Sequence, residues 1–458
     1  MDAVRGSQNS GTEPAMKVTR LPIDPGPAGW NRLLPDPAPA MVLEGAQTAD
    51  WLIIGAGFAG LAAARRLRQL CPDDQIMVLE AARVADGPAG RNSGFMIDLP
   101  HDLASAAYGG SLDADFAQTE DNRRAIDFAE AMATEFDLPA EAFSRCGKTN
   151  AAATDKGHQH NLDYAKHLDA MGEAYHFLTA DQMHEMTGIP YYQSGLFTPG
   201  AAIIQPAMFM RGVAQALTSN RVSIFENSPV TALERRANWI ATTPIGQITA
   251  PKVILAVNGH LNSFGHLKNR LMHVFTYASM TRSLTPGEAT KLGGKPVWGV
   301  TPADPMGTTV RRISGVGGDR IVVRNRFTFD PLMQVSDKRI ARVGQNHDRA
   351  FAARFPMLHG VEMEHRWGGR LCLSLNNVQV VRELEQGLYS ACCQNGLGTA
   401  KGTLAGMLTA ELPNGISSAS LERALSAPEP TKLPPRRIAQ LGATLRLRWS
   451  ELRAGREI

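Results

Sequence analysis

A glycine-rich turn between an apolar strand and an alanine-rich helix constrains this fold more than any other feature of the sequence. The turn reads Gly55-Ala56-Gly57-Phe58-Ala59-Gly60. It follows the apolar run Trp51 to Ile54, and a second apolar run, Ile76 to Leu79, comes after the helix. Gly55 permits a tight turn, Gly57 lets a pyrophosphate approach the backbone, and Gly60 lets the helix pack on the strand. The pattern predicts a βαβ unit that binds a dinucleotide at the helix N-terminus.

An acidic residue, Glu80, ends the second predicted strand. A carboxylate there can accept hydrogen bonds from both ribose hydroxyls and disfavours a 2′-phosphate. We therefore expect an α/β protein with a Rossmann-type nucleotide-binding domain. A glycine turn without a ligand is the alternative.

A second glycine-rich stretch, Gly90 to Gly94, follows about ten residues after Glu80. This stretch decides whether FAD or NAD is the expected dinucleotide. Alone, it reads as a polar loop. Together with Ile54 to Gly60 and residues 80–84, however, it resembles the opening of the flavoprotein family of D-amino acid oxidase, glycine oxidase and sarcosine oxidase. The resemblance implies that the cofactor is FAD and that Arg91, Asn92 and Ser93 lie along the flavin.

The resemblance extends over most of the chain beyond residue 47. Its later motifs are Gln205-Pro206, Val230, residues 256–259 and residues 395–399. A glycine turn before a helix, as at the last of these, directs N–H donors towards the negative charge that reduction places on the flavin. An ordinary helix cap is the alternative there. The cofactor contacts that the resemblance implies are Gly55, Gly57, Phe58, Ala59, Gly60, Glu80, Ala81, Arg83, Gly90, Arg91, Asn92, Ser93, Gly94, Val230, Asn258, Gly259, Gly396, Leu397, Gly398 and Thr399.

The resemblance implies oxidation of a small amine or amino acid to an imine, which water hydrolyses to a carbonyl compound and ammonia or an amine. Oxygen or another acceptor then takes the electrons. Only one complete glycine fingerprint stands between a strand and a helix, because residues 315–318 are predicted to form a hairpin turn. The sequence therefore does not support a second nucleotide site for NADPH. A flavin monooxygenase or reductase using NAD(P)H, and a non-catalytic flavin-binding subunit, are the alternatives.

Orienting the substrate is the main chemical demand, and a substrate carboxylate is best held by a bidentate arginine. Arg311, Arg312, Arg324 and Arg326 lie in strands that resemble the substrate-domain sheet of the family. Arg312 is the first candidate and Arg311 the second. Because side chains alternate along a strand, only one of these two neighbours should point inward.

Three further side chains are candidates near the flavin. Tyr277 offers a phenol that can bracket the amine, and His260 offers an imidazole that can accept a proton. Cys372 lies near the position where some members of the family attach flavin covalently, although a small buried apolar role suits it as well. Sarcosine-type members carry a basic residue where this chain has Gly398, so their carboxylate clamp is not expected here.

The chain is expected to divide into a discontinuous FAD-binding domain and a second, mixed-sheet substrate domain. Prolines between residues 14 and 39 predict an irregular N-terminal arm on the surface. Apolar residues at helical spacing after Pro435 predict an amphipathic tail helix that docks on its own protein, with a subunit contact as the alternative. The boundaries are: arm 1–46; FAD-binding domain 47–105, 200–265 and 366–425; substrate domain 106–199 and 266–365; tail 426–458.

Composition gives no indication of a macromolecular partner. Lysine and arginine number 47 against 44 acidic residues, a net charge of +3 that suggests neither nucleic-acid binding nor a basic membrane patch. The five cysteines lack the spacing of a disulfide framework, and no run reaches the ~18 apolar residues of a spanning helix. His158, His160 and His167 lack a carboxylate or thiolate to complete a metal site. We therefore expect a cytoplasmic enzyme without a metal, with homo-oligomer formation left open.

Overall fold

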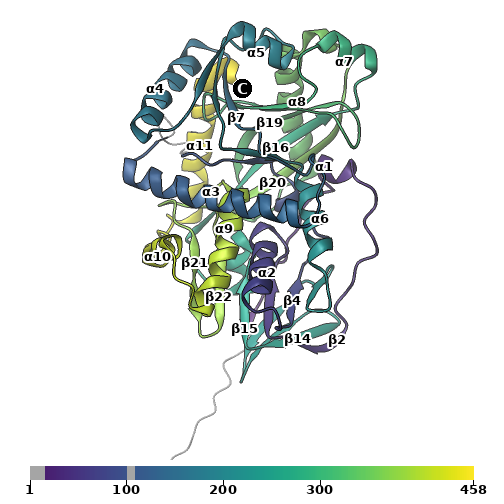
Figure 1. Cartoon of the computed structure of the whole chain (residues 1–458), viewed down its shortest axis with the longest axis vertical. Helices are drawn as coiled ribbons and strands as arrows, with labels where there is room; N and C mark the ends of the chain where they lie inside the picture. Colours follow the sequence, from purple (N-terminus) through teal and green to yellow (C-terminus); the bar gives the residue numbers. More distant parts are fainter. Residues whose placement is uncertain (1–15, 101–108) are drawn as a thin grey trace, which may run out of the picture.

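Two lobes, each built on its own large sheet, make up the computed structural model, which describes residues 16–100 and 109–458. Figure 1 shows the lobe that carries the glycine-rich turn below and the lobe with the larger sheet above. The chain passes between the lobes several times. The mixed α/β architecture predicted from the sequence is confirmed.

The lower lobe contains a six-stranded sheet in which five neighbouring strands are parallel. Its spatial order is β11 (Val222–Phe225), β4 (Ile76–Leu79), β3 (Trp51–Ile54), β15 (Lys252–Leu255), β22 (Leu388–Cys392) and the antiparallel β21 (Val380–Glu385). On one face pack α2 (Phe58–Leu70) and α9 (Gly398–Glu411), followed by α3 (Leu112–Glu135), α6 (Pro206–Leu217) and α10 (Ala419–Ser426). The parallel strands are short and mostly apolar, as expected for a parallel sheet covered on both faces.

A second, five-stranded sheet covers the other face of the parallel sheet. Its order is β1 (Met16–Lys17), β12 (Ala232–Arg235), β13 (Trp239–Thr242), β14 (Gly246–Ala250) and β2 (Gly45–Thr48). This sheet contains the meander predicted between residues 230 and 250, and β15 then returns to the first sheet. A small sheet of β5 (Phe95–Met96), β10 (Ala202–Ile204) and β6 (Phe143–Ser144) lies between the lobes.

The upper lobe is built on a mixed, eight-stranded sheet. Its order is β20 (Met363–Ser374), β16 (Leu271–Thr281), β19 (Arg320–Phe329), β18 (Thr309–Ile313), β17 (Trp298–Pro302), β7 (Lys148–Ala152), β9 (Ser194–Thr198) and β8 (His176–Thr179). One face packs against α5 (Ala180–Thr187), α7 (Pro286–Leu292) and α8 (Asp337–Arg354). The other face contributes apolar side chains to the same core as α2, α6 and α9, so it is turned towards the lower lobe. The hairpin predicted at residues 315–318 joins β18 to β19.

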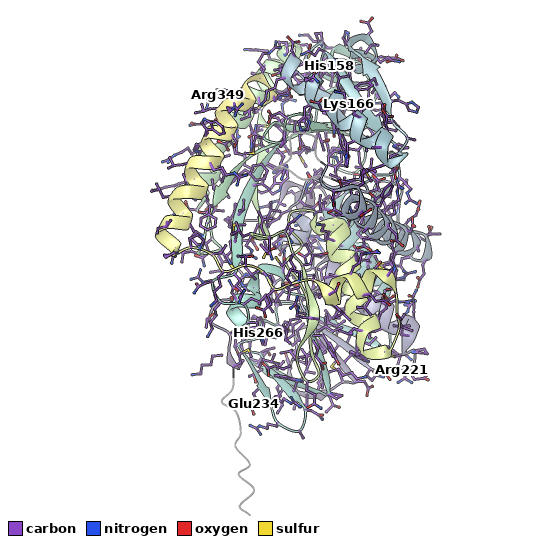
Figure 2. All side chains as sticks on the ribbon, turned by 90° about the vertical axis from the view of Figure 1, so that its left-hand side faces the viewer. His158, Lys166, Arg221, Glu234, His266 and Arg349 are labelled. Carbon is purple, nitrogen blue, oxygen red and sulfur yellow. The ribbon has the colours of Figure 1, made fainter. Side chains whose placement is uncertain are left out.

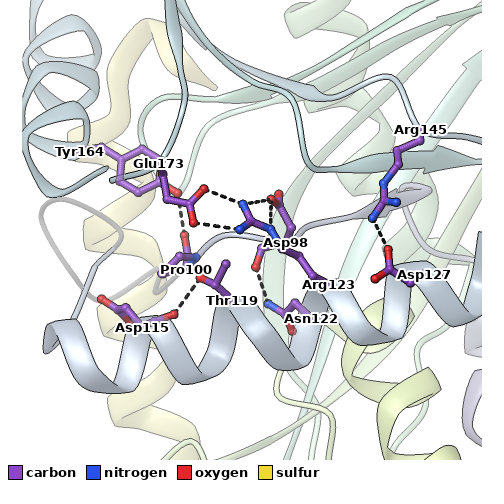
Figure 3. Close-up of polar contacts among 10 residues, drawn as sticks. All are labelled: Asp98, Pro100, Asp115, Thr119, Asn122, Arg123, Asp127, Arg145, Tyr164 and Glu173. Carbon is purple, nitrogen blue, oxygen red and sulfur yellow. Dashed lines mark hydrogen bonds and ion pairs between the residues drawn. The ribbon is translucent and has the colours of Figure 1, made fainter. Parts of the chain in front are cut away.

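Buried polar contacts fix the chain that leaves β5. Figure 3 shows the Asp98 carboxylate within 3.1 Å of the Arg123 guanidinium on α3, which also pairs with Glu173 at 2.6 Å. The Tyr164 hydroxyl on α4 (Asp155–Met171) donates to the Pro100 carbonyl at 3.0 Å. These contacts tie α3 and α4 to the segment that follows the second glycine-rich stretch.

The prediction of an irregular N-terminal arm on the surface holds for most of residues 16–46, which are irregular and exposed, but it is wrong around Trp30; residues 1–15 lie outside the described residues. β1 and β2 join the five-stranded sheet, and a short helix, α1 (Gly29–Arg32), lies between the lobes (Figure 1). The Trp30 side chain is fully buried and meets Trp367 edge to face, with ring centroids 6.1 Å apart. Prolines prevent long regular elements, but they do not prevent an extended chain from burying its apolar side chains.

The expected return of the chain to the cofactor domain at residue 366 is also wrong, because β20 continues in the eight-stranded sheet to Ser374. Gly368 and Gly369 lie within this strand. A Cβ atom at Gly369 would be 3.0 Å from the Arg91 carbonyl oxygen. Gly369 therefore serves a close approach of two backbones, which is a common use of glycine in strands.

The C-terminal helix α11 (Arg436–Ala454) docks on its own protein as predicted, but not through the predicted residues. Ala439, Ala443 and Leu447 pack against the eight-stranded sheet. The apolar stripe that the sequence suggested would be buried is exposed, by 60% to 81%; its members are Ile438, Leu441, Leu445, Trp449 and Leu452. No helix within the described ranges is both long and apolar enough to span a membrane.

Candidate active site

The first glycine-rich turn has the geometry of a dinucleotide cradle. Gly55 has φ 103°, and a Cβ atom at Gly60 would lie 1.8 Å from the Gly55 carbonyl oxygen, so the helix rests directly on the turn. The N-cap of α2 is Gly57, which offers no side-chain cap. The N–H groups of the first turn are therefore free of side-chain partners and face the anion position of a Rossmann unit.

Glu80 ends β4 beside this turn. Its carboxylate accepts hydrogen bonds from the N–H groups of Ala56 at 2.8 Å and Ala82 at 3.2 Å. Burial raises the pKa of Glu80, and the backbone donors oppose that shift. The carboxylate thus lies at the helix N-terminus, where a Rossmann acid meets a ribose.

Residues 226–230 run alongside Glu80 on the side where the resemblance places the adenine. The Ser228 N–H donates to the Glu80 carbonyl at 2.9 Å, and buried Val230 follows two residues later. The Arg83 guanidinium donates to the Glu226 carboxylate at 2.8 Å. Arg83 therefore holds this segment against the loop after β4.

The second glycine-rich stretch forms a tight, internally bonded turn. The Asn92 side chain accepts from the Gly94 N–H at 2.8 Å and donates to the Ala89 carbonyl at 2.6 Å, and Gly94 has φ 82°. A Cβ atom at Gly90 would lie 1.9 Å from the Ala85 carbonyl oxygen. Both glycines are thus required by the backbone.

Arg91, predicted as a cofactor contact, is buried and bonded to backbone carbonyls. Its guanidinium donates to the carbonyls of Asp86 at 2.6 Å, Gly368 at 3.3 Å and Gly26. Burial lowers the pKa of Arg91. The side chain therefore joins the glycine-rich loop to the N-terminal segment and to β20.

The third motif, residues 395–399, meets the second one directly. The Thr399 hydroxyl in the first turn of α9 donates to the Phe95 carbonyl at 2.8 Å. Gly396 has φ 84°, and the N-cap Leu397 gives no side-chain cap. The Asn258 side chain accepts from the Cys393 N–H at 3.1 Å, which ties the end of β15 to the same turn.

Two glycines let α9 pack closely on α2. A Cβ atom at Gly406 would lie 2.0 Å from the Ala59 carbonyl oxygen, and one at Gly402 would lie 3.2 Å from the Phe58 Cβ. The N-terminal turns of both helices therefore lie on the same side of the lobe. Two helix N-termini without side-chain caps, with a carboxylate beside one of them, fit the pyrophosphate, the ribose and the electron-rich end of FAD.

Arg311 points towards this cradle from the eight-stranded sheet. Its guanidinium donates to the carbonyls of Ser93 at 2.9 Å and Ile204 at 2.8 Å, and it lies over the Trp30 ring at 5.0 Å. Burial lowers the pKa of Arg311 to about 10. No acid among the described residues forms an ion pair with it, and its Nε has no partner there.

Arg324 shares that face of the sheet. It lies opposite Thr309 on β18 and Ala278 on β16, and Ala278 belongs to the core shared with the lower lobe. Within the described residues its guanidinium makes no hydrogen bond and no ion pair, and its one directed contact is the Phe327 ring at 5.2 Å. Burial lowers the pKa of Arg324 to about 10. The side chain of Arg324 is half-buried, and a charge that is partly removed from water is normally paired in proteins.

The structure places Arg312 on the opposite face, as alternation requires for a neighbour of Arg311. It forms a two-pronged ion pair with the Asp319 carboxylate, at 2.6 and 3.0 Å, and also donates to the Gly293 carbonyl at 2.5 Å. Tyr277 lies on that face too, packed on α8 with its hydroxyl 2.6 Å from the Thr328 hydroxyl. Neither is brought together with the cradle.

His260 and Cys372 are buried beside the motifs at residues 256–259 and 395–399, and the Asn395 N–H donates to the Cys372 carbonyl at 3.1 Å. His260 Nδ1 is 3.3 Å from the Ser263 hydroxyl, and burial lowers the pKa of His260 to about 2, so the imidazole is neutral and a weak base. The hydrogen bond with Cys393, together with burial, raises the pKa of the Cys372 thiol. A protonated, buried thiol is poorly suited to covalent attachment.

Sequence reasoning missed two residues of this site. Trp30 lay in a segment taken for a surface arm, and Arg324 was one of four strand arginines but was not chosen. A signal for Arg324 was present, because Arg311 and Arg324 share a face once the hairpin register is known. That register follows from the turn at residues 315–318 and is not fixed by the alternation of β18 alone.

With this geometry in place, comparison with known proteins defines the class. A model of the family described as FAD-dependent oxidoreductase (DAO) matches residues 50–412, so the chain belongs to that family. It is an FAD-dependent oxidoreductase of the amine and amino-acid oxidase type, and the predicted cofactor and family are confirmed.

Individual relatives are distant but align over nearly their whole length. The chain is 24% identical over 417 residues to a probable oxidoreductase OrdL of Rhizobium meliloti, covering 87% of this chain and 90% of that protein. It is 24% identical over 397 residues to a gamma-glutamylputrescine oxidoreductase of Escherichia coli, covering 82% and 86% respectively. Glycine oxidase from Geobacillus kaustophilus shares the fold with a TM-score of 0.66 at 17% identity, covering 81% of this chain and 96% of that one.

Proposed function

We propose that this enzyme oxidises a small amine that carries a carboxylate, such as an amino acid, to an imine that water then hydrolyses. The observation that carries the proposal is Arg324, a half-buried guanidinium without an acidic partner among the described residues, on the sheet face turned towards the FAD cradle. A substrate carboxylate is the ligand that matches a guanidinium in charge and planar geometry. The similarity to a gamma-glutamylputrescine oxidoreductase supports oxidation of a carbon–nitrogen bond.

Arg324 and Arg311 have different roles in this proposal. Arg311 already donates to the carbonyls of Ser93 and Ile204, so it positions the second glycine-rich loop. The donors of Arg324 have no partner among residues 16–100 and 109–458, and we assign this side chain the substrate carboxylate. Arg312, Tyr277 and His260 take structural roles, because their partners are other parts of the chain.

In the proposed reaction the carbon–nitrogen single bond becomes a double bond, and two electrons and two protons leave the substrate. FAD, when bound, supplies the two-electron oxidant. The protein fixes the carboxylate and so orients the α-carbon and the amine, and the aromatic rings of Trp30 and Phe327 beside the arginines limit water. Water then adds to the imine carbon, and ammonia or an amine leaves with a carbonyl compound as the other product.

An anaerobic titration of the holoenzyme tests this proposal. Each member of a panel of amino acids is paired with the amine that lacks its carboxylate, and the visible absorbance of the flavin is followed. We expect bleaching by one or more carboxylated amines, at concentrations at least tenfold below those of the matching decarboxylated amines. Bleaching by NAD(P)H alone, or equal bleaching by both members of every pair, would overturn the proposal.

A further inference from the structure

The outward face of α11 carries a continuous apolar stripe that the fold leaves uncovered. Five large apolar side chains are 60% to 81% exposed, and they are Ile438, Leu441, Leu445, Trp449 and Leu452. At 3.6 residues per turn these positions fall within an arc of about 80° on the helix. Figure 2 shows the helix, in yellow, along the outer edge of the molecule. Single exposed apolar residues are ordinary, but a contiguous stripe marks an interaction surface.

The helix is a fixed part of the surface, because contacts hold the chain at both of its ends; before the helix, the Leu433 N–H donates to the Asn269 carbonyl at 2.7 Å. The Glu451 carboxylate is 1% exposed and pairs with Arg326 on β19 and with Arg448, the latter at 2.8 Å. Beyond the helix, the Glu457 carboxylate accepts from the Ala153 N–H at 2.8 Å, and the Arg354 guanidinium donates to the Glu457 carbonyl at 2.9 Å. The outward direction of the stripe is therefore set by packing on the other face.

Basic side chains flank the stripe on both sides. Arg446 and Arg453 lie on one flank and Arg448 on the other, by the same helical spacing, and all three are exposed. The Arg453 guanidinium stacks on the Trp449 ring at 4.6 Å. The one acidic residue of the helix, Glu451, is turned inward and neutralised. The exposed charged side chains that the structure describes on α11 itself are thus all positive.

We propose that α11 docks this enzyme on an anionic phospholipid surface, with the helix lying in the plane of the interface. The apolar stripe enters the boundary between headgroups and acyl chains, and the flanking arginines reach the lipid phosphates. Trp449 is the residue type favoured at that depth. The helix lies outside the family match, which ends at residue 412, so docking is an addition to the shared catalytic domain.

Charge argues against a second copy of the chain as the occupant. A two-fold contact places a surface against itself, so the stripe would pair with a stripe while the arginine rows faced each other. Like charges directly opposed weaken such a contact. An anionic bilayer can bury the apolar stripe and pair the arginines with lipid phosphates at the same time.

Vesicle flotation with the full-length holoenzyme tests the proposal. Vesicles of phosphatidylcholine alone are compared with vesicles of equal parts phosphatidylcholine and phosphatidylglycerol, at low and high salt. We expect flotation with the anionic vesicles only, weakened at high salt. The variant Leu441→Gln/Leu445→Gln/Trp449→Gln should bind at least tenfold more weakly, and Arg446→Gln/Arg453→Gln should lose the salt dependence. Thr444→Gln, exposed on the same helix but outside the stripe, is the matched control and should bind like the parent.

Because the substituted side chains are exposed, the variants should keep their flavin content and melting temperature, which are measured alongside. Absence of flotation by the parent at low salt would overturn the proposal, as would equal flotation by the triple variant. Sedimentation that shows a concentration-dependent dimer, lost in the triple variant without any vesicle binding, would assign the stripe to a second copy and reject the lipid surface. None of these outcomes depends on the substrate, so they are independent of the proposed function.

Discussion

Arg324 should cost this protein stability while it serves catalysis, and the substitution Arg324→Met separates the two effects. Burial lowers the pKa of Arg324 to about 10, from an ordinary value of about 12.5. That difference corresponds to about 3 kcal/mol, and the partial exposure of the side chain reduces it to about 2 kcal/mol. Methionine fills a similar volume without charge. The variant should therefore be more stable than the parent by about 2 kcal/mol at neutral pH.

The same substitution should impair turnover of carboxylated amines. Removing one partner of a buried, hydrogen-bonded charge pair typically costs about 2–4 kcal/mol, so kcat/KM should fall by roughly 30-fold to 1000-fold. Decarboxylated amines should be affected by less than about threefold, because they do not engage the guanidinium. Urea unfolding at saturating FAD and steady-state kinetics on paired substrates measure both effects.

Arg312→Met is the matched control, because Arg312 lies on the neighbouring strand β18 but faces the opposite side of the sheet. It breaks the two-pronged pair with Asp319, so it should destabilise the protein by about 1–3 kcal/mol while kcat/KM changes little. An Arg324→Met protein that is less stable than the parent, with kcat/KM unchanged, would refute the assignment of Arg324 to the substrate.

Three further predictions concern the cofactor and the buried charges. Glu80→Gln exchanges one acceptor oxygen for a donor beside the Ala56 N–H, so FAD should bind about 10-fold to 100-fold more weakly in a fluorescence titration; unchanged affinity would remove Glu80 from the ribose site. Burial lowers the pKa of Lys148 to about 8; the folded state loses this proton first, so stability should rise with pH between about 8 and 10.5. Urea unfolding should show that rise in the parent and not in Lys148→Met, and equal slopes would contradict it. Because the Cys372 thiol is buried with a raised pKa, acid precipitation should release all the flavin into the supernatant; retained flavin that Cys372→Ala abolishes would show covalent attachment.

The nucleotide-binding half of the molecule was predictable because residues close together in the sequence determine its backbone geometry. A tight turn, a close backbone approach and a helix resting on a strand each require glycine at a set spacing, so Gly55, Gly57 and Gly60 determine one local geometry. Gln205 before Pro206 likewise begins a helix, with its side chain accepting from the Met208 N–H. Such features depend on residues only a few positions apart.

The wrong predictions concern places where contacts between residues far apart in the sequence determine the structure. Proline content described most of residues 16–46 correctly as irregular, but burial of Trp30 depends on Trp367, far away in the sequence. Helical spacing predicted an amphipathic α11, yet its protein-facing side is made of Ala439, Ala443 and Leu447, because small side chains allow the helix to approach the sheet. The larger apolar residues were left to the outside.

The strand arginines show the same difference between what neighbouring residues determine and what distant contacts determine. Alternation predicted that Arg311 and Arg312 face opposite sides, and they do. Which of them faces the cofactor depends on how the eight-stranded sheet is oriented on the lower lobe. The net charge of the whole chain, +3, likewise gave no indication of the local row of arginines on α11.

A crystal structure of the FAD complex with a carboxylated substrate analogue that cannot be oxidised would test the central claim most directly. The account predicts that the analogue lies between the flavin and the eight-stranded sheet, with its carboxylate oxygens within hydrogen-bond distance of the Arg324 guanidinium. A carboxylate held elsewhere, with Arg324 still lacking a partner, would contradict it.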